Sequence, residues 1–400
     1  MSHDSGMPPK QTHTGRSTTR DAALIFFIAV LTGMTLFGLT EMTARMLFRE
    51  SSTKAIDCMI VDDPSTGVRA VPNSVCVEKL AEGPRPVEYR FNRCGHRMDT
   101  DCGAKSSGHF RIVLVGSSFV MGLETPVDAT FAAKLPITLT QPHGPSVDVY
   151  NEGMENGFPA SMPLKFGEIL AAKPDLILWV LTPFDIKNSS TVLPGRDVNT
   201  QGFIARNWAR IRLALATKPL PDALADIGQR GVDAFGATKT ALMLRHILYQ
   251  SQSQYVTSYL AGGDDEAGFL NARASPAWQD RLRTFDRYAA RFIQQAREAK
   301  LPILTVLLPN RAQAAMISMG HWPDGYDPYA LGSAVGAVVT RHGGDYVDVL
   351  HDYREIPDPQ RGYFAVDGHP NDRGHAVIAR ILAGRLSERV IGSIRTGAGS

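Results

Sequence analysis

The segment Arg111–Phe119, which reads R-I-V-L-V-G-S-S-F, constrains the fold of this chain more than any other. A run of consecutive apolar residues rich in β-branched side chains is typical of a strand covered on both faces. Gly116 ends the run where the backbone has to turn. Ser118 is therefore predicted to stand at the C-terminal end of a buried strand, which is where open α/β sheets bind ligands.

Similar apolar runs recur along the chain and alternate with helical patterns. We predict further strands near 147–150, 176–181, 303–308 and 346–350. The clearest helix pattern runs from Pro276 to Lys300, with Ser275 as its N-cap and apolar residues along one face. Alternating strands and helices imply a parallel sheet with helices on both sides.

Composition excludes some classes of function. Of 400 residues, 44% are hydrophobic and 20% charged, and the formal net charge of +2 gives no large field, so we expect no nucleic-acid binding. Residues 188–275 carry helical patterns such as Ile204–Ala216 and Thr240–Leu260 but no convincing strand. We interpret this region as a helical insertion that caps the site; a separately folded domain is the alternative.

The N-terminal region has a long run without a charged residue, from Ala22 to Thr40. It is long enough to span a bilayer as a helix. We interpret it as a signal anchor, because it is longer than a usual signal-peptide core and no clear cleavage site follows. A cleaved signal peptide and a buried helix are the alternatives. Charges on its two sides do not fix the orientation.

Four cysteines lie between this run and the first core strand: Cys58, Cys76, Cys94 and Cys102. An even number clustered in this way suggests disulfides and an oxidising compartment. Pairing Cys58 with Cys76 and Cys94 with Cys102 is the local option among three connectivities, and unpaired thiols are the alternative. The spacings are not of the close kind that binds zinc, and we expect no metal site.

A second block that carries chemistry reads F-A-V-D-G-H-P-N, from Phe364 to Asn371. A serine hydroxyl needs an imidazole base to act as a nucleophile, and the imidazole needs an acceptor that fixes its tautomer. Ser118, His369 and Asp367 supply all three groups. Taken alone, each has an ordinary use in a turn or loop, and Ser117 is a less favoured nucleophile.

The G-S-S-F block around Ser118 and the D-G-H-P-N block around His369 resemble the opening G-D-S-F and closing D-x-H blocks of the SGNH/GDSL hydrolase superfamily. The closer likeness is to bacterial members with one N-terminal membrane segment, because Glu88–Asp99 resembles an element that precedes their serine block. The resemblance spans roughly Tyr89 to Leu386. It implies a flavodoxin-like three-layer α/β/α core with a five-stranded parallel sheet, a Ser-His-Asp triad and no cofactor.

From pattern and resemblance together we expect four parts. These are a disordered tail at 1–21, a transmembrane anchor at 22–41, a membrane-proximal cysteine-containing segment at 42–107 and a catalytic domain at 108–390 with its insertion at about 188–275. The last of these would lie in the periplasm, with the anchor in the inner membrane of a bacterium. The oligomeric state does not follow from the sequence.

Polar residues follow the other strands as well. The carboxyl ends of the parallel strands in a doubly wound sheet lie at one edge. We therefore expect Asp185, Asn310 and Arg311 to contact substrate. For the oxyanion hole the resemblance implies the Ser118 backbone, a glycine after the second strand and an asparagine after the third. Gly157 or the Asn156 side chain fits the second position, but Phe184 stands where the asparagine is expected. Asn156 or Asn188 would have to replace it.

The resemblance implies an esterase that removes O-acyl groups, O-acetyl in the first place, from a surface glycan or a lipid-linked substrate. The first alternative is an O-acyltransferase of an exopolysaccharide, which would share the acyl-enzyme. The second is a degenerate, non-catalytic protein that binds glycan or assists assembly. Ser117 and Phe184 depart from the family pattern and favour the second alternative, whereas the intact Ser118, Asp367 and His369 oppose it.

Overall fold

A computed structural model describes residues 17–61, 67–99, 101–139, 146–192 and 231–397. Its centre is a parallel sheet of five strands in the order β6-β5-β7-β8-β9. The strands are listed here in chain order: β5 (His109–Val115), β6 (Ser146–Asn151), β7 (Leu176–Leu181), β8 (Ile303–Leu307) and β9 (Asp345–Val347). This is the order of the flavodoxin-like doubly wound fold, so the predicted fold class is confirmed.

The sheet is buried because apolar residues occupy both of its faces. Every residue of β7 and β8 is buried, as a parallel strand covered on two sides requires. On β7, Trp179 packs against Phe285 and Phe292 of the long helix α11. That helix, Pro276–Glu298, begins where Ser275 accepts a hydrogen bond from the Trp278 N–H. Its predicted N-cap and apolar face are thus confirmed.

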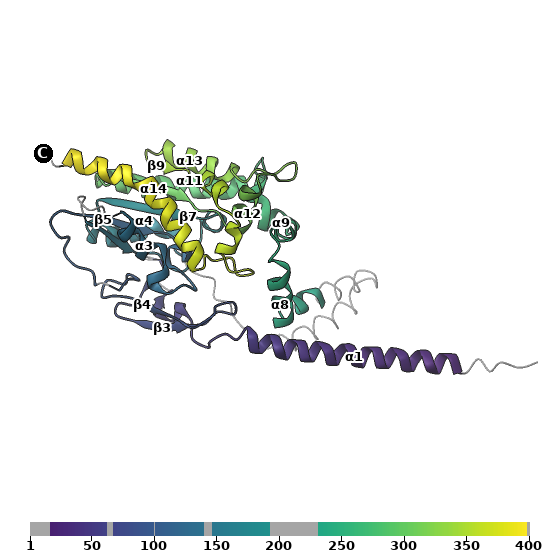
Figure 1. The fold of residues 1–400 in the computed structure, drawn as a ribbon. Coiled ribbons are helices and arrows are strands. Elements are labelled where there is room, and N and C mark those ends of the chain that lie inside the picture. The colour runs from purple at the N-terminus through teal and green to yellow at the C-terminus, as the bar shows by residue number, and fades with distance from the viewer. Residues whose placement is uncertain (1–16, 62–66, 100, 140–145, 193–230, 398–400) are drawn as a thin grey trace, which may run out of the picture.

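Helices make the two outer layers (Figure 1). Helix α14 packs on α3, while α11 packs on both α4 and α13. The helices around the sheet are α2 (Ser118–Met121), α3 (Phe131–Leu139), α4 (Met162–Ala171), α5 (Pro183–Lys187), α12 (Arg311–Met319), α13 (Ala330–Arg341) and α14 (Asp372–Gly397). Short 3-10 turns connect them at η2 (Val127–Ala129), η3 (Pro159–Ser161), η5 (His351–Glu355) and η6 (Pro359–Gly362).

The region expected as an insertion lies partly outside the described residues, and Ile204–Ala216 falls there entirely. Its described part is helical, with α8 (Lys239–Leu248), α9 (Gln252–Leu260), α10 (Gly263–Ala267) and η4 (Gly268–Leu270). The pattern at 240–260 is therefore two helices. The first ends at Leu248 with Tyr249 as its C-cap, and Ser251 is the N-cap of the second.

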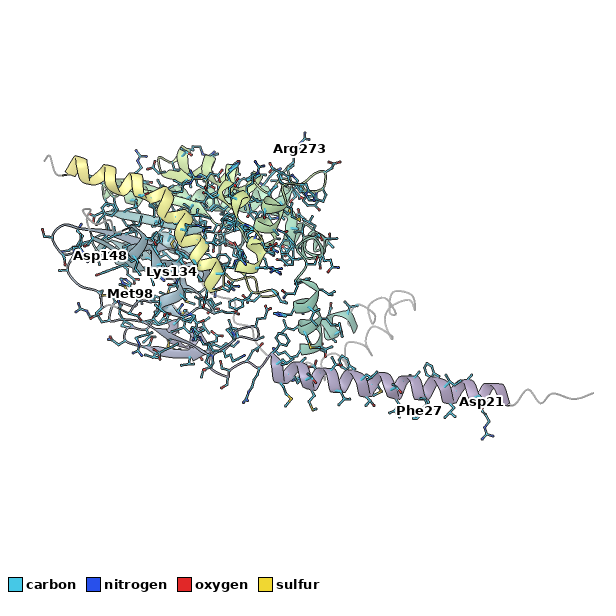
Figure 2. The ribbon with its side chains drawn as sticks, viewed as in Figure 1. Asp21, Phe27, Met98, Lys134, Asp148 and Arg273 are labelled. Atoms are coloured by element: carbon cyan, nitrogen blue, oxygen red, sulfur yellow. A yellow bond between two sulfur atoms is a disulfide. The ribbon has the colours of Figure 1, made fainter. Side chains whose placement is uncertain are left out.

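The N-terminal helix α1, Ser17–Leu47, is longer than the uncharged run in the sequence. Its segment Arg20–Leu47 is long enough to cross a membrane, and an 18-residue window within it has a mean hydropathy of 2.3 and no buried residue. Figure 2 shows Asp21 and Phe27 projecting from the part of α1 that extends away from the rest of the protein. An exposed apolar helix of this kind is consistent with a single-pass anchor.

The C-terminal end of α1 packs against α8. The Glu41 carboxylate accepts hydrogen bonds from the Thr240 N–H and hydroxyl, both at 2.8 Å, and so caps the start of α8. Phe48 packs against the His246 ring at 5.5 Å between centroids. The apolar helix α1 therefore contacts the described part of the insertion, α8 to η4, which is called the helical region below.

No strand was predicted in the cysteine-containing segment, and in this respect the structure differs from the sequence analysis. It forms η1 (Ala55–Cys58) and two antiparallel ribbons, β1 (Met59–Ile60) with β2 (Arg69–Ala70) and β3 (Val75–Glu78) with β4 (Val87–Arg90). Strands of two to four residues are too short to show a two-residue period. Disulfides join Cys58 to Cys76 and Cys94 to Cys102, which is the local pairing.

Candidate active site

Ser118 stands at the first residue of α2, directly after β5 and its turn. Gly116 makes this turn because a Cβ there would lie 2.4 Å from the carbonyl oxygen of Val180 on the neighbouring strand. The Ser118 side chain is mostly buried, with the residue 9% exposed. Since Ser118 opens the helix, its backbone N–H has no acceptor within α2.

His369 and Asp367 come to Ser118 from the loop before α14. The Nε2 atom of His369 lies 2.7 Å from the Ser118 Oγ, and its Nδ1 lies 2.5 Å from the Asp367 Oδ1. The same carboxylate oxygen accepts the His369 backbone N–H at 3.0 Å. With Nδ1–H donated to the carboxylate, Nε2 is free to accept the serine proton, which is the tautomer that a general base requires.

Charges in the site favour an ionised Asp367. Burial raises the pKa of the Asp367 carboxyl, but the charge of His369 and its hydrogen bonds outweigh burial and leave the pKa below its usual value. Phe119 covers the imidazole with 5.4 Å between ring centroids. The site therefore has an oriented base and a hydrophobic cover on one side.

The triad opens into a cavity of about 440 Å³, a size typical of small-molecule sites. Residues from the helical region form one wall, and those around the triad form the other. The lining residues used below are Phe184, Arg245, Tyr249, Tyr255, Tyr259, Phe269, Trp278, Asn310 and Arg311. Five aromatic rings follow one another along this wall, from Tyr249 to Trp278, at 5.1 to 6.3 Å between centroids.

Asn310 and Arg311 both line the cavity, but their polar groups form hydrogen bonds within the fold. Asn310 caps α12 by accepting the Gln313 N–H at 2.9 Å, and its amide donates to the Tyr259 hydroxyl at 2.9 Å. Arg311 donates to the carbonyls of Tyr249, Gln360 and Ala365 and lies 3.8 Å from the Tyr255 ring centroid. Arg311 thus connects the helical region to the loop before α14, called the catalytic loop below because it carries Asp367 and His369.

Asp185 does not reach the cavity, so its expected contact with substrate is wrong. It is 1% exposed, and its carboxylate accepts the N–H and hydroxyl of Thr182 at 2.7 and 2.8 Å, forming a capping box at the start of α5. Burial raises the pKa of Asp185 to about 6, against hydrogen bonds from Ser117 and Thr182. Ser117 is 2% exposed and serves this buried carboxyl, which leaves Ser118 as the serine that meets His369.

The expected oxyanion donors are placed less favourably than the triad. The Gly157 N–H donates to the Met154 carbonyl at 2.9 Å, and the Asn188 amide donates to the Phe184 carbonyl at 2.9 Å. Among the described residues that line the cavity, neither Gly157 nor Asn156 is found. Asn156 adopts a left-handed conformation with φ of 59°, as a turn before glycine requires. Phe184, 55% exposed, occupies the cavity wall where the asparagine was expected.

One buried side chain that the sequence did not single out binds the turn after Ser118. Arg97 is 1% exposed and donates to the carbonyls of Met121, Gly122 and Thr125 at 2.6 to 2.7 Å. Its guanidinium also lies 4.3 Å from the Tyr89 ring centroid. The available signal was its place in the stretch that resembles the element preceding the serine block.

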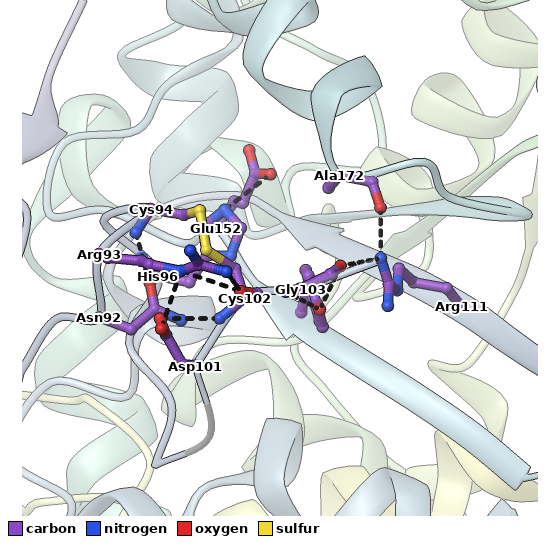
Figure 3. Close-up of a disulfide and its surroundings, with 11 residues drawn as sticks. Asn92, Arg93, Cys94, His96, Asp101, Cys102, Gly103, Arg111, Glu152 and Ala172 are labelled. Atoms are coloured by element: carbon purple, nitrogen blue, oxygen red, sulfur yellow. Dashed lines mark hydrogen bonds and ion pairs between the residues drawn. A yellow bond between two sulfur atoms is a disulfide. The ribbon is translucent and has the colours of Figure 1, made fainter. Parts of the chain in front are cut away.

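The Cys94–Cys102 disulfide closes the loop that carries Arg97 (Figure 3). Beside it, Arg93 pairs with Asp101 at 2.8 Å and donates to the Cys102 carbonyl, and His96 lies 3.1 Å from the Glu152 carboxylate. The cross-linked loop therefore carries the side chain that binds the turn after Ser118. Within the described ranges, no group of three or more His, Cys, Asp or Glu side chains is placed to hold a metal ion.

No protein-family model matches the chain, and no curated protein matches it either. Among solved structures, TesA is similar over 70% of this chain and 98% of its own, with 14% identity and a TM-score of 0.34. A member of the lipolytic protein G-D-S-L family from Veillonella parvula DSM 2008 is similar over 68% of this chain and 95% of its own, with 12% identity and a TM-score of 0.33. At identities and TM-scores this low, the likeness carries no inference about the reaction, which has to be judged from the site itself.

Proposed function

We propose that this protein is a membrane-anchored serine esterase of the SGNH/GDSL type that cleaves O-acyl esters outside the cytoplasm. The observation that carries the proposal is the hydrogen-bonded series Ser118–His369–Asp367 at the edge of a cavity. In a Ser-His-Asp arrangement, the carboxylate orients the imidazole and stabilises its charged form.

The reaction proceeds in two halves. Ser118 Oγ attacks the ester carbonyl while His369 Nε2 takes the hydroxyl proton. The tetrahedral intermediate then expels the alcohol, which receives that proton from His369, and an acyl-serine remains. In the second half His369 takes a proton from water, the hydroxide attacks the acyl carbonyl, and the proton returns to Ser118 as the acid leaves.

Several features support a glycan or lipid-linked ester as substrate. Tyr and Trp rings of the cavity wall present apolar faces with polar edges, which suits a sugar that has both C–H and hydroxyl groups. Arg245 and Tyr249, at the end of α8, also line the cavity, and α8 begins against the C-terminal end of α1. Exposed Leu244, Ile247 and Leu248 lie on the same helix. The cavity therefore lies near the proposed membrane surface.

Localisation rests on the apolar helix and the two disulfides. Disulfides persist in oxidising compartments, so we place the α/β domain in the periplasm, with α1 in the inner membrane. Because the domain and the disulfides follow α1 in the chain, they lie on the same side of the membrane. Replacing Cys58 or Cys94 by serine frees the thiol of its partner, Cys76 or Cys102. Labelling of that thiol by a membrane-impermeant reagent in intact cells tests this placement.

The function is tested with the full-length protein in detergent and p-nitrophenyl acetate. We expect acetate release that is lost in Ser118→Ala. A short oligosaccharide in the assay then separates two reactions: free acetate alone identifies a hydrolase, and acetylated sugar identifies an acyltransferase. A folded protein that releases no nitrophenol and forms no acyl-enzyme would overturn the proposal and favour a binding protein.

A further inference from the structure

Glu82 lies between β3 and β4, far in sequence from the triad, yet its carboxylate meets the catalytic loop. The side chain is 2% exposed. Its Oε2 accepts the N–H of Val366 at 2.8 Å and the N–H of Asp367 at 2.7 Å. Asp367 is the acidic member of the triad, and Val366 is the residue before it.

The other oxygen of the same carboxylate binds the helical region. Glu82 Oε1 lies 2.7 Å from His246 Nδ1, and His246 belongs to α8. Arg311 adds a positive charge nearby and donates to the carbonyl of Ala365, the residue before Val366. The loop is therefore held at consecutive residues, through its carbonyl by Arg311 and through its N–H groups by Glu82.

The orientation of Asp367 depends on these contacts. A buried carboxylate needs hydrogen-bond partners, and two consecutive N–H groups reach the same oxygen only in backbone conformations that turn both toward it. That backbone also sets the direction in which the Asp367 side chain leaves the loop. A change of about 1 Å in a supporting contact is enough to misplace a catalytic group.

We infer that Glu82 is a positioning residue of the reaction, which fixes the Asp367 carboxylate and through it the tautomer and orientation of His369. This inference rests on the proposed function. Among the described residues, Glu82 forms no hydrogen bond with Ser118 or with the imidazole of His369, so it acts through Asp367. Through its contact with His246, Glu82 also joins α8, the helix that contacts α1, to the catalytic loop that carries His369.

The chain offers a matched control in Glu78. It is 6% exposed, lies in the same β3–β4 ribbon and accepts one backbone N–H, that of Ala55 at 2.8 Å. It therefore shares burial, charge and a backbone hydrogen bond with Glu82, but its hydrogen bond does not involve the catalytic loop. The Glu78 carboxyl also lies within electrostatic range of Asp367, so its loss reports what removing a nearby buried carboxylate does without removing a hydrogen bond to the catalytic loop.

The test compares Glu82→Met, Glu82→Gln and Glu78→Met in the full-length protein in detergent, with melting temperature measured for each. Methionine keeps the length of the side chain and removes the acceptor, whereas the glutamine oxygen still accepts both N–H groups. We expect Glu82→Met to lower kcat for p-nitrophenyl acetate by about 30-fold or more with KM nearly unchanged, and Glu82→Gln to recover to within about fivefold of the parent.

A second readout does not need turnover. The proton shared by His369 Nδ1 and Asp367 gives a downfield resonance in the proton NMR spectrum, which we expect to be lost or displaced in Glu82→Met and kept in Glu82→Gln and Glu78→Met. Equal kcat losses in the two methionine variants, or an unchanged resonance in Glu82→Met, would overturn the positioning role. Absence of activity in the parent would instead contradict the proposed function, and the resonance would still decide the role of Glu82.

Discussion

Ser118 and His369 are 251 residues apart in the chain, and the Ser118 Oγ lies 2.7 Å from His369 Nε2. The parallel sheet makes this contact because β5 ends at the turn before Ser118 and the loop after β9 returns to the same edge. The arrangement supplies the nucleophile, the base and the orienting carboxylate that the proposed function requires. It leaves the oxyanion donors as the weakest part of the site.

Phe184 offers a direct test of that weakness. It lines the cavity at the second residue of α5, where the family pattern has an asparagine. One lost oxyanion donor typically costs 10²- to 10³-fold in rate, so we expect Phe184→Asn to raise kcat for a small aryl ester by about tenfold or more. Phe184→Leu, which adds no donor, is the control. An asparagine variant no faster than the leucine variant would mean that another group already serves as donor.

Arg97 is predicted to stabilise the protein by holding the turn that follows Ser118. Replacing it with methionine removes the donors to three buried carbonyls, of Met121, Gly122 and Thr125. The Gly122 carbonyl still accepts the Thr125 N–H at 3.1 Å. Each of the other two acceptors, left unsatisfied, costs about 1 to 3 kcal/mol, so the free energy of unfolding should fall by at least about 2 kcal/mol. Chemical denaturation checks this, with exposed Arg283→Met as control. Similar losses in both variants would contradict the role given to Arg97.

His375 gives the protein a predicted sensitivity to acid. It is fully buried in α14 and its Nδ1 accepts the Phe131 N–H at 3.2 Å. Burial, together with the charge of Arg97, lowers the pKa of His375 to about 3 from 6.5. Because the folded-state pKa is below the unfolded one, its contribution to stability is complete above pH 6.5 and is lost as pH falls toward 3.

At pH 5 this group alone should reduce the free energy of unfolding by about 2 kcal/mol relative to pH 7. His375→Gln keeps an acceptor for the Phe131 N–H and has no proton to gain, so its stability should fall less over this interval. Denaturant titration at both pH values measures the difference, with exposed His321→Gln as control. Parallel losses in His375→Gln and the parent would contradict the assignment.

The sequence was informative where a pattern is local. Continuous apolar runs predicted the strands of the sheet, because a strand covered on both faces has to be apolar at every position. Ser118, Asp367 and His369 were found because each lies in a short motif. Asp185 was misread although Thr182-x-x-Asp185 is itself a capping-box pattern, which is a structural use of the carboxylate.

Contacts between distant segments did not follow from any pattern. Glu82 reaches Asp367 across 285 residues, and Arg97 reaches Met121 across 24. Glu82 has no spacing or neighbouring residue that distinguishes it from an exposed charged side chain, and the stretch that contains Arg97 resembles a known element without indicating what Arg97 binds. Only the folded chain, in which both are buried against backbone groups of the catalytic loops, identifies their partners.

Covalent labelling of Ser118 by a fluorophosphonate tests the central claim most directly. The full-length protein in detergent is treated with the probe, and the modified peptide is identified by mass spectrometry. We expect one label per chain on Ser118, retained in Ser117→Ala and absent in Ser118→Ala, with labelling slowed strongly in His369→Gln. A folded protein that remains unlabelled, or that carries the label on Ser117, would contradict an activated Ser118.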